Sequence, residues 1–367
     1  MHKANREIKV VRPIVVDKIA SVAIDTEIGR EIRISPDIPC EEGILIAVEI
    51  LNNKSRYNTL ELTSGRMAQV KQGDIIVGAL GHRKALFGYS GHIPEQLAPG
   101  DVVQLLNLGG VLGICDSINP NQGQPFDCRV LGVALDFPYL GERIGVPARV
   151  KNTPVADPSP LDVRGIPVVA FAGTCMNSGK TAAACAVISR LSQRGLTVDA
   201  FKATGVALQR DILAMEDAGA RNTGIFSDHG VVCTTSDNAP ELTRKLLVGL
   251  AGEDPDVIVF ELGDGLIGAY GVEAILLDTE VRNTLSALIL CANDPVGALG
   301  GVKLLREEFE IEPVAVTGPA TDNQVGIEII ERRLGVRAAN ALTQGAALGD
   351  LIQDQVGLAS ASTEVAP

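Results

Sequence analysis

The pattern of hydrophobic and polar positions divides the chain near residue 150. Before that point, short apolar runs are separated by turn residues at close spacing, as at 71–74 and 98–101. Closely spaced strands of this kind are typical of a β-barrel or sandwich. The pattern predicts strands over residues 8–16, 43–51, 74–80, 85–89 and 101–106. We therefore expect a β-rich N-terminal domain over residues 1–150, barrel-like or sandwich-like.

After residue 167 the pattern changes to alternating strands and helices. The apolar run 167–172 is typical of a strand buried on both faces in a parallel sheet, and 181–194 has the spacing of a helix that ends before Gly195. Further strands are predicted over 197–201, 256–260, 286–291 and 313–316, and further helices over 241–250, 301–309 and 324–334. This alternation predicts an α/β domain with a mostly parallel sheet flanked by helices.

The two domains are joined by a stretch rich in proline. Pro154, Pro158 and Pro160 interrupt regular structure, so residues 151–163 are expected to form a linker. The α/β domain is then expected over 164–352. Residues 353–367, which contain Ser, Ala and Thr, are expected to form a mobile tail.

The first strand of the α/β domain leads into a loop with the features of a phosphate-binding loop. Residues 173–181 read Gly-Thr-Cys-Met-Asn-Ser-Gly-Lys-Thr. The strict Walker A pattern, GxxxxGK[ST], fails because Thr174 stands where its first glycine belongs and Gly173 lies one residue earlier. A chance Gly-Lys-Thr tripeptide is the alternative. The buried strand before the loop and the Ala-rich helix after it favour nucleotide binding.

Each residue type in this loop has a chemical reason to be there. Backbone N–H groups and the helix N-terminus attract phosphate, and Gly179 lets the backbone approach it closely. Lys180 is expected to bind the β- and γ-phosphates, and Thr181 is expected to bind Mg²⁺ through its hydroxyl. The residues expected to bind the nucleotide are Gly173, Thr174, Asn177, Ser178, Gly179, Lys180 and Thr181.

Three segments together resemble a known superfamily. The loop at 173–181 resembles that of dethiobiotin synthetase and of the cobyrinic and cobyric acid synthases. Residues 201–205 and 256–265 are similar to that family's second strand and to its Glu-Gly-Ala-Gly-Gly segment. Residues 202–205, 261–265 and 287–291 also resemble segments of the DUF1611 family, which has a related P-loop domain. The resemblance covers about residues 165–340 and none of the N-terminal domain.

The resemblance implies a catalytic set of Lys180, Lys202, Glu261 and Asp264, with Thr181 and Glu261 as metal ligands. It also implies ATP and Mg²⁺ as cofactors and a homodimer as the assembly. Cys175 replaces the acidic residue of the family's loop, and Asp264 is a candidate for the missing carboxylate. Lys202 remains open to the alternative of a surface lysine at a strand end.

Other polar residues carry weaker signals. Arg210 and Asp211 could face the site or only decorate a helix. Asp228 with His229 could form a base, but a loop feature is the simpler interpretation. Cys175 is interpreted as a small residue that fits the loop, although a helix N-terminus would lower the pKa of its thiol.

The roles of two further groups of residues stay open. Asn323 follows the 313–316 strand and could contact the base. In the N-terminal domain His82, Arg83 and His92 form a polar group that is interpreted as a solvated strand face.

Composition limits the partners. The net charge is −13, which argues against nucleic acid because phosphate backbones are bound by basic surfaces. The seven cysteines are scattered, which favours reduced thiols over a disulfide framework. There is no signal-peptide pattern and no apolar run of about 18 residues. We therefore expect a cytoplasmic protein with no membrane partner and a small-molecule substrate.

Two functions follow as hypotheses. The first is an ATP- and Mg²⁺-dependent enzyme that activates a small-molecule carboxylate, carbamate or similar group by phosphoryl transfer, as a synthetase does. The alternative is a nucleotide-dependent switch or assembly NTPase whose β-domain binds a partner. The chain has no Asn-Lys-X-Asp guanine signature, which favours ATP over GTP.

Overall fold

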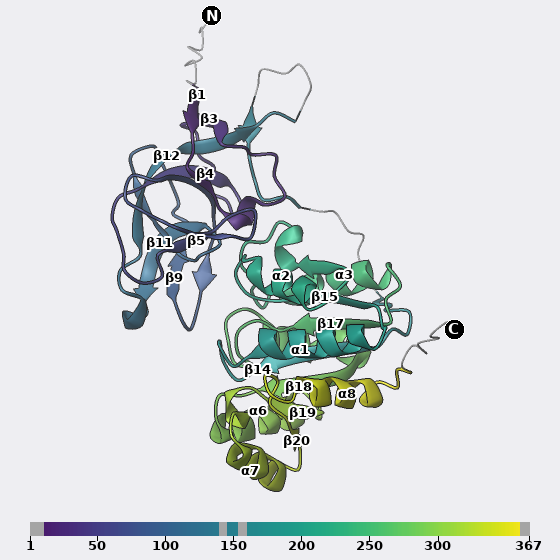
Figure 1. Cartoon of the computed structure of the whole chain (residues 1–367). Helices are drawn as coiled ribbons and strands as arrows, with labels where there is room; N and C mark the ends of the chain where they lie inside the picture. Colours follow the sequence, from purple (N-terminus) through teal and green to yellow (C-terminus); the bar gives the residue numbers. More distant parts are fainter. Residues whose placement is uncertain (1–10, 139–144, 153–159, 360–367) are drawn as a thin grey trace, which may run out of the picture. The chain divides into compact units, whose positions relative to one another are not determined.

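The computed structural model describes residues 11–138, 145–152 and 160–359 (Figure 1). The chain forms two compact units. The N-terminal unit takes in the chain up to Thr153 and two later segments, Val206–Gln209 and Ser227–Cys233, and the C-terminal unit takes in the rest. The predicted domain boundary at residue 150 did not anticipate the two later segments.

The N-terminal unit is built on a closed ring of paired strands. Strand β4 pairs with β7, β7 with β11, β11 with β10, β10 with β12, and β12 again with β4. A sheet that closes on itself is a barrel, so the barrel form of the predicted domain is the one observed. Its strands within the described ranges are β1 (Arg12–Val15), β2 (Lys18–Ile19), β3 (Glu31–Ser35), β4 (Leu45–Ile50), β5 (Thr59–Glu61), β6 (Met67–Gln69), β7 (Ile75–Leu80), β8 (Arg83–Lys84), β9 (Tyr89–His92), β10 (Val102–Leu105), β11 (Val111–Ile118), β12 (Phe126–Asp136) and β13 (Val146–Pro147).

One strand prediction in this unit is wrong. Residues 85–89 were expected to be extended, but 85–88 form the turn between β8 and β9. Gly88 explains the turn, because its φ of +132° is a conformation that residues with side chains rarely adopt. The long strands β11 and β12 were not among those expected.

The C-terminal unit contains a parallel sheet. In spatial order its described strands are β16 (Thr223–Ile225), β15 (Val198–Lys202), β17 (Val257–Glu261), β14 (Val168–Gly173), β18 (Leu285–Cys291), β19 (Ala315–Thr317) and β20 (Arg337–Ala338). Every neighbouring pair in this order is parallel. The carboxyl ends of all these strands therefore meet at one edge, which is where ligands bind in such sheets.

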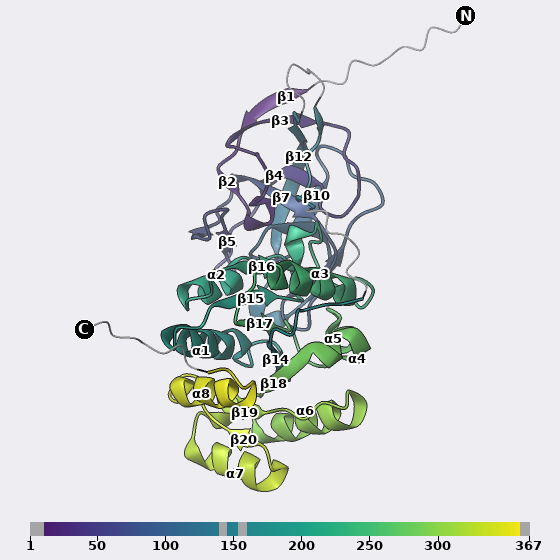
Figure 2. The same ribbon diagram turned by 90° about the vertical axis from the view of Figure 1, so that its right-hand side faces the viewer.

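Helices cover both faces of this sheet, as Figures 1 and 2 show. Alternate residues of β14 point to opposite sides: Val168 packs in the core with α3, α6 and α7, and Val169 packs in the core with α1, α2 and α8. The described helices are α1 (Lys180–Gln193), α2 (Arg210–Asp217), α3 (Ala239–Ala251), α4 (Val272–Leu277), α5 (Thr279–Thr284), α6 (Pro295–Glu308), α7 (Gln324–Leu334) and α8 (Gly345–Gln355). The predicted α/β fold is confirmed.

No helix in the described ranges combines the length and apolar character needed to cross a bilayer.

The chain's predicted joining segments lie only partly in the described ranges. Of the predicted linker, 151–163, residues 153–159 lie outside them. Of the predicted mobile tail, residues 360–367 lie outside them, whereas 353–355 continue α8 and Gln353 is buried. The helix therefore runs past the predicted start of the tail.

A buried carboxylate fixes the edge of the parallel sheet. Asp199 in β15 is fully buried and receives hydrogen bonds from the Arg221 guanidinium at 3.0 and 2.7 Å and from the backbone and side chain of Asn222. The Arg221 side chain is 42% exposed, so the pair is only half shielded from water. Because Asp199→Ala removes the whole set of hydrogen bonds at once, we expect it to lower the free energy of unfolding by about 2 kcal/mol. Thermal denaturation then shows a melting temperature lower by roughly 4 to 8 °C.

The exposed pair Arg306–Glu312 provides the control, because Glu312→Gln at that pair should cost less than about 1 kcal/mol. Equal effects of the two substitutions would show that Asp199 contributes no more than a surface ion pair.

Candidate functional site

The loop between β14 and α1 turns sharply from the end of a strand to the start of a helix. Strand β14 is buried throughout and ends at Gly173, and α1 begins at Lys180. Two residues between them take left-handed backbone angles, Asn177 with φ of +62° and Gly179 with φ of +90°. Gly179 lies at the N-cap of α1, so the free N–H groups of the first helical turn face the loop.

The position of the first glycine, one residue earlier than in the Walker A pattern, has a steric reason. A Cβ at Gly173 would lie 2.3 Å from Ser178 Oγ and 2.8 Å from Lys180 Nζ. A Cβ at Gly265 would lie 2.9 Å from the carbonyl oxygen of Thr174, on the other side of the loop. A side chain at either position would clash with the phosphate loop. Glycine at 173, one residue earlier than in the Walker A pattern, therefore lets the loop pack closely against its neighbours.

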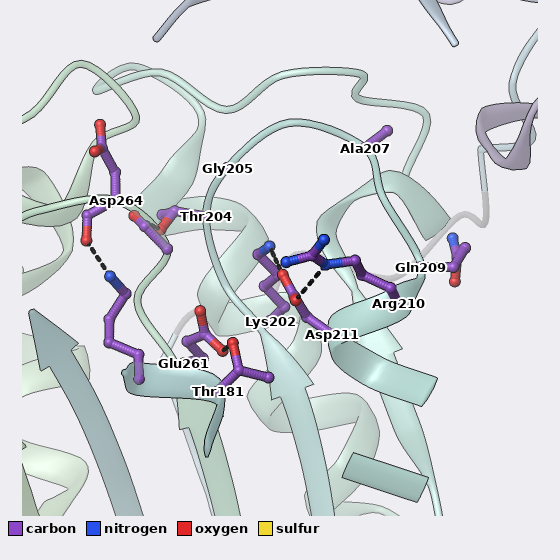
Figure 3. A network of polar contacts seen from close by, with 12 residues as sticks. Thr181, Lys202, Thr204, Gly205, Ala207, Gln209, Arg210, Asp211, Glu261 and Asp264 are labelled. Carbon is purple, nitrogen blue, oxygen red and sulfur yellow. Dashed lines mark hydrogen bonds and ion pairs between the residues drawn. The ribbon is translucent and has the colours of Figure 1, made fainter. Parts of the chain in front are cut away.

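Lys180 is buried and lies across the loop. Its Nζ donates to the carbonyl oxygens of Cys175 at 3.0 Å and Asp264 at 2.6 Å, and Figure 3 shows the second of these bonds. Both acceptors are neutral. Phosphate oxygens would be stronger acceptors for an ammonium than these carbonyls.

Thr181, which follows Lys180 in the chain, contacts Glu261. Thr181 Oγ1 donates to Glu261 Oε2 at 2.8 Å, and Glu261 is the last residue of β17, buried at the carboxyl edge. A hydroxyl and a carboxylate oxygen are ligands that Mg²⁺ takes in proteins. Ser178 Oγ, which is buried, has no hydrogen-bond partner among the described residues. A phosphate oxygen would satisfy it, so the residues present fit a Mg²⁺–nucleotide.

A second buried lysine stands beside Glu261. Lys202 ends β15 and pairs in register with Glu261 of β17. Its Nζ forms an ion pair with Asp211, the second residue of α2, and Arg210 Nε lies 3.6 Å from the same carboxylate (Figure 3). The side chains of Lys202 and Asp211 are only 10% and 13% exposed, so this ion pair is largely shielded from water. Lys202 is therefore not a surface lysine.

Burial and charge act in opposite directions on this cluster. Burial alone would lower the pKa of Lys202, but the Asp211 and Glu261 carboxylates outweigh it and raise that pKa. Burial would raise the pKa of Asp211, but the Lys202 ammonium lowers it. Burial and the neighbouring Asp211 raise the pKa of Glu261. Lys202 and Asp211 are thus both charged. A cation placed beside Glu261 would favour the ionised form of its carboxyl group.

Asp264 contacts the phosphate loop through its main chain. Its buried backbone carbonyl accepts from Lys180, and its φ of +77° is a strained conformation for a residue with a side chain. In Figure 3 its carboxylate points away from Glu261 and Thr181. The structure therefore assigns Asp264 a contact through its main chain, and a role for its carboxylate stays a prediction.

The residues with weaker sequence signals lie in different surroundings. Cys175 lies in the loop, and its Sγ accepts from Asn293 Nδ2 at 3.0 Å. Asn323 is the N-cap of α7 and accepts from Val325 N at 3.1 Å, a structural role. Asp228 and His229 belong to the N-terminal unit, not to the unit with the phosphate loop.

Sequence reasoning did not commit to Asp211. The available signal was its position nine residues after Lys202, at the start of a helix that follows a carboxyl-end strand. In the N-terminal unit, the predicted solvated strand face is wrong for Arg83, which is 2% exposed and donates to the carbonyl of Leu106. His92 is exposed and lies 2.8 Å from Asp116.

Comparisons with known proteins find similarity at the level of solved structures only. No protein-family model and no curated protein matches the chain. The chain is similar to the signal recognition particle receptor FtsY from Elizabethkingia anophelis in complex with GDP, at 15% identity and a TM-score of 0.38 over 51% of this chain and 63% of that one. It is similar to a DUF1611 family protein from Anabaena variabilis at 15% identity and a TM-score of 0.37, over 55% of this chain and 62% of that one.

A third similar structure is the hydrogenase maturation factor HypB from Archaeoglobus fulgidus, at 15% identity and a TM-score of 0.38, over 53% of this chain and 90% of that one. The chain spans less than two-thirds of the FtsY and DUF1611 structures. The parallel strand order and the loop between β14 and α1 are features of the chain itself.

Proposed function

We propose that the C-terminal unit binds ATP with Mg²⁺ and transfers the γ-phosphoryl group to a small-molecule carboxylate, carbamate or similar oxygen, as a dethiobiotin-synthetase-like enzyme does. The observation that carries the proposal is the gathering of Lys180, Thr181, Glu261 and the Lys202–Asp211 pair at one edge of the parallel sheet. A switch protein needs the first three of these residues. A second buried lysine beside them is what an anionic acceptor would use.

The proposed roles follow from the contacts of each side chain. Lys180 exchanges its two carbonyl acceptors for phosphate oxygens. Thr181 and Glu261 hold Mg²⁺, which supplies Lewis-acid stabilisation of charge on the phosphates. Lys202 is kept charged by Asp211 and so can bind an acceptor carboxylate in a site of low water content. Asp211 is proposed as the residue that positions Lys202.

ATP is proposed because the chain lacks the Asn-Lys-X-Asp segment by which many GTP-binding proteins recognise guanine. A homodimer remains the proposed assembly, on the resemblance alone.

The proposal is tested by measuring ADP release from ATP and GTP in the presence and absence of a panel of small carboxylates, and of amines with bicarbonate. We expect one acceptor class to raise Mg²⁺-dependent ADP release by about tenfold or more. Lys202→Gln should lose this stimulation and keep nucleotide affinity, whereas Lys303→Gln, at an exposed lysine of α6, should change neither. Slow ADP release that no acceptor changes would contradict the synthetase proposal.

A second candidate, a nucleotide switch, is favoured by one observation. The segments Val206–Gln209 and Ser227–Cys233 belong to the N-terminal unit, although the first directly follows Gly205 and directly precedes Arg210 and Asp211. A change at Lys202–Asp211 could therefore be transmitted to the barrel along the chain. If hydrogen exchange in these segments changes with ATP while no small molecule stimulates turnover, the switch becomes the better description.

A further inference from the structure

The barrel of the N-terminal unit carries a cavity that the phosphate-loop chemistry does not use. It has a volume of about 340 Å³ and lies between the segment after β4 and the segment that follows β11. Lys54, Ser55 and Arg56 line it on one side, and Asn121, Gln122 and Gln124 line it on the other. None of its described lining residues is acidic. We call it the Lys54 cavity.

Lys54 is held by aromatic rings. Its Nζ lies 4.8 Å from the ring centroid of Tyr89, 5.4 Å from that of Phe126 and 5.9 Å from that of Tyr57. Tyr89 and Phe126 are almost completely buried. Among the described residues no carboxylate lies within ion-pair distance of Lys54, since none of the described salt bridges includes it. Cation–π contacts therefore take the place of a counter-ion.

The Tyr89 hydroxyl connects Lys54 to the opposite wall of the cavity. It accepts a hydrogen bond from Lys54 Nζ and lies 3.0 Å from the carbonyl oxygen of Gly123 and 3.2 Å from that of Gln122. Burial raises the pKa of Tyr89 to about 12, so this hydroxyl stays a donor to those carbonyls. The ring of Tyr57 packs edge-on against Tyr89 with centroids 5.6 Å apart. Lys54 is thus fixed in place by a rigid aromatic platform.

A second cation stands at the cavity. Arg56 is exposed, and its only described contact is a long one, from Nη1 to the carbonyl of Asn121 at 3.5 Å. Its guanidinium can present two parallel N–H groups to a carboxylate or a phosphate. Two basic residues and no acidic residue line this cavity, in a chain whose net charge is −13.

We propose that the Lys54 cavity is a binding site for a small organic anion, whose carboxylate or phosphate group pairs with Lys54 and Arg56. The anion supplies the counter-ion that Lys54 lacks among the described residues, and the amides of Asn121, Gln122 and Gln124 line the same cavity. This site shares no residue with the proposed nucleotide site, because all of its residues belong to the N-terminal unit.

The ionisation of Lys54 provides a direct readout. Burial lowers the pKa of Lys54 to about 8, and a bound anion would raise it again. Near pH 8 a far larger fraction of Lys54 than of an exposed lysine is therefore the neutral, nucleophilic amine. An amine-reactive aldehyde should therefore modify Lys54 ahead of exposed lysines.

The experiment uses the full chain, pyridoxal 5′-phosphate near pH 8, borohydride reduction of the imine, and peptide mapping by mass spectrometry. We expect labelling of Lys54 to exceed that of the exposed Lys71 and Lys84 by about tenfold or more. Inorganic phosphate or succinate at millimolar concentration should reduce the labelling of Lys54 severalfold and leave Lys71 unchanged. Because each lysine is read separately, labelling of Lys180 or Lys202 does not confuse the result.

Protection by phosphate alone, by succinate alone or by both supports the proposal and identifies the group that is bound. Arg56→Gln should abolish most of the protection, while Arg66→Gln, at an exposed arginine of the same unit, should not. Selective labelling of Lys54 that neither anion reduces would overturn the proposal and leave a reactive lysine without an anion site. Equal labelling of Lys54 and Lys71 that neither anion changes would overturn it as well.

Discussion

Lys180→Ala is expected to lower the affinity for ATP by about a hundredfold, because it removes the buried ammonium from the centre of the phosphate loop. Charge-assisted hydrogen bonds contribute roughly 1.5–3 kcal/mol each, and the Nζ of Lys180 has at least two acceptor positions in the loop. Losing about 3 kcal/mol of binding free energy corresponds to that loss of affinity. Isothermal titration with ATP and Mg²⁺ measures it.

The substitution must be separated from damage to the fold, because Lys180 also joins Cys175 to Asp264. The melting temperature of the variant in the absence of nucleotide provides that check. Lys303→Ala, on the exposed side of α6, is the matched control and should bind ATP as the parent chain does. A Lys180→Ala protein that is folded and binds ATP with unchanged affinity would remove the phosphate loop from the proposed function.

Glu261→Gln should lower Mg²⁺-dependent turnover by about 100- to 1,000-fold, since one charged ligand of the proposed metal site is lost. The amide oxygen of glutamine can still accept from the Thr181 hydroxyl, so the local packing is preserved. Binding of ATP without Mg²⁺ should change little, and the gain in affinity that Mg²⁺ gives the parent chain should disappear. Glu253→Gln, at an exposed carboxylate of the same unit, is the control.

The pH profile gives an independent measure of the same carboxylate. Burial and the neighbouring Asp211 raise the pKa of Glu261, so it takes up a proton at a higher pH than an ordinary glutamate. Only the ionised form can hold the metal. At limiting Mg²⁺ the turnover of the parent chain should therefore fall as the pH falls through this raised pKa. The acid limb should be missing from the Glu261→Gln profile, and an unchanged limb would assign it to another group.

The central part of the C-terminal unit could be predicted because its pattern is strong and local. The apolar run of β14 has no polar interruption, and α7 (Gln324–Leu334) begins and ends where its periodicity predicts, between an Asn N-cap and a Gly C-cap. Lys180 and Thr181 followed from their position between a strand and a helix. Their contacts with Asp264 and Glu261 join residues about 80 positions apart, so only the fold could supply them.

Two helices of the C-terminal unit were predicted poorly because their sequences lack a clear helical pattern. Helix α6 begins at Pro295, six residues before the predicted start, because Gly297, Gly300 and Gly301 disguise its first turns. The Asp294 N-cap with proline at the next position was the usable signal, and it was missed. Helix α2 was missed because it is only eight residues long, and Asp211 was left undecided with it.

The N-terminal unit includes two segments that come late in the chain, so it cannot be completed early in synthesis. Gln209 N donates to the buried Glu61 carboxylate, and Val232 N and Cys233 N both lie within hydrogen-bond distance of Glu42 Oε1. A ribosome must therefore synthesise the chain as far as residue 233 before the barrel has all its parts. During that interval β14, α1 and β15 already exist as nascent chain. An expression fragment cut at the proline-rich stretch would likewise lack these donors, so a soluble, intact barrel should be sought by keeping residues 206–233 in the polypeptide.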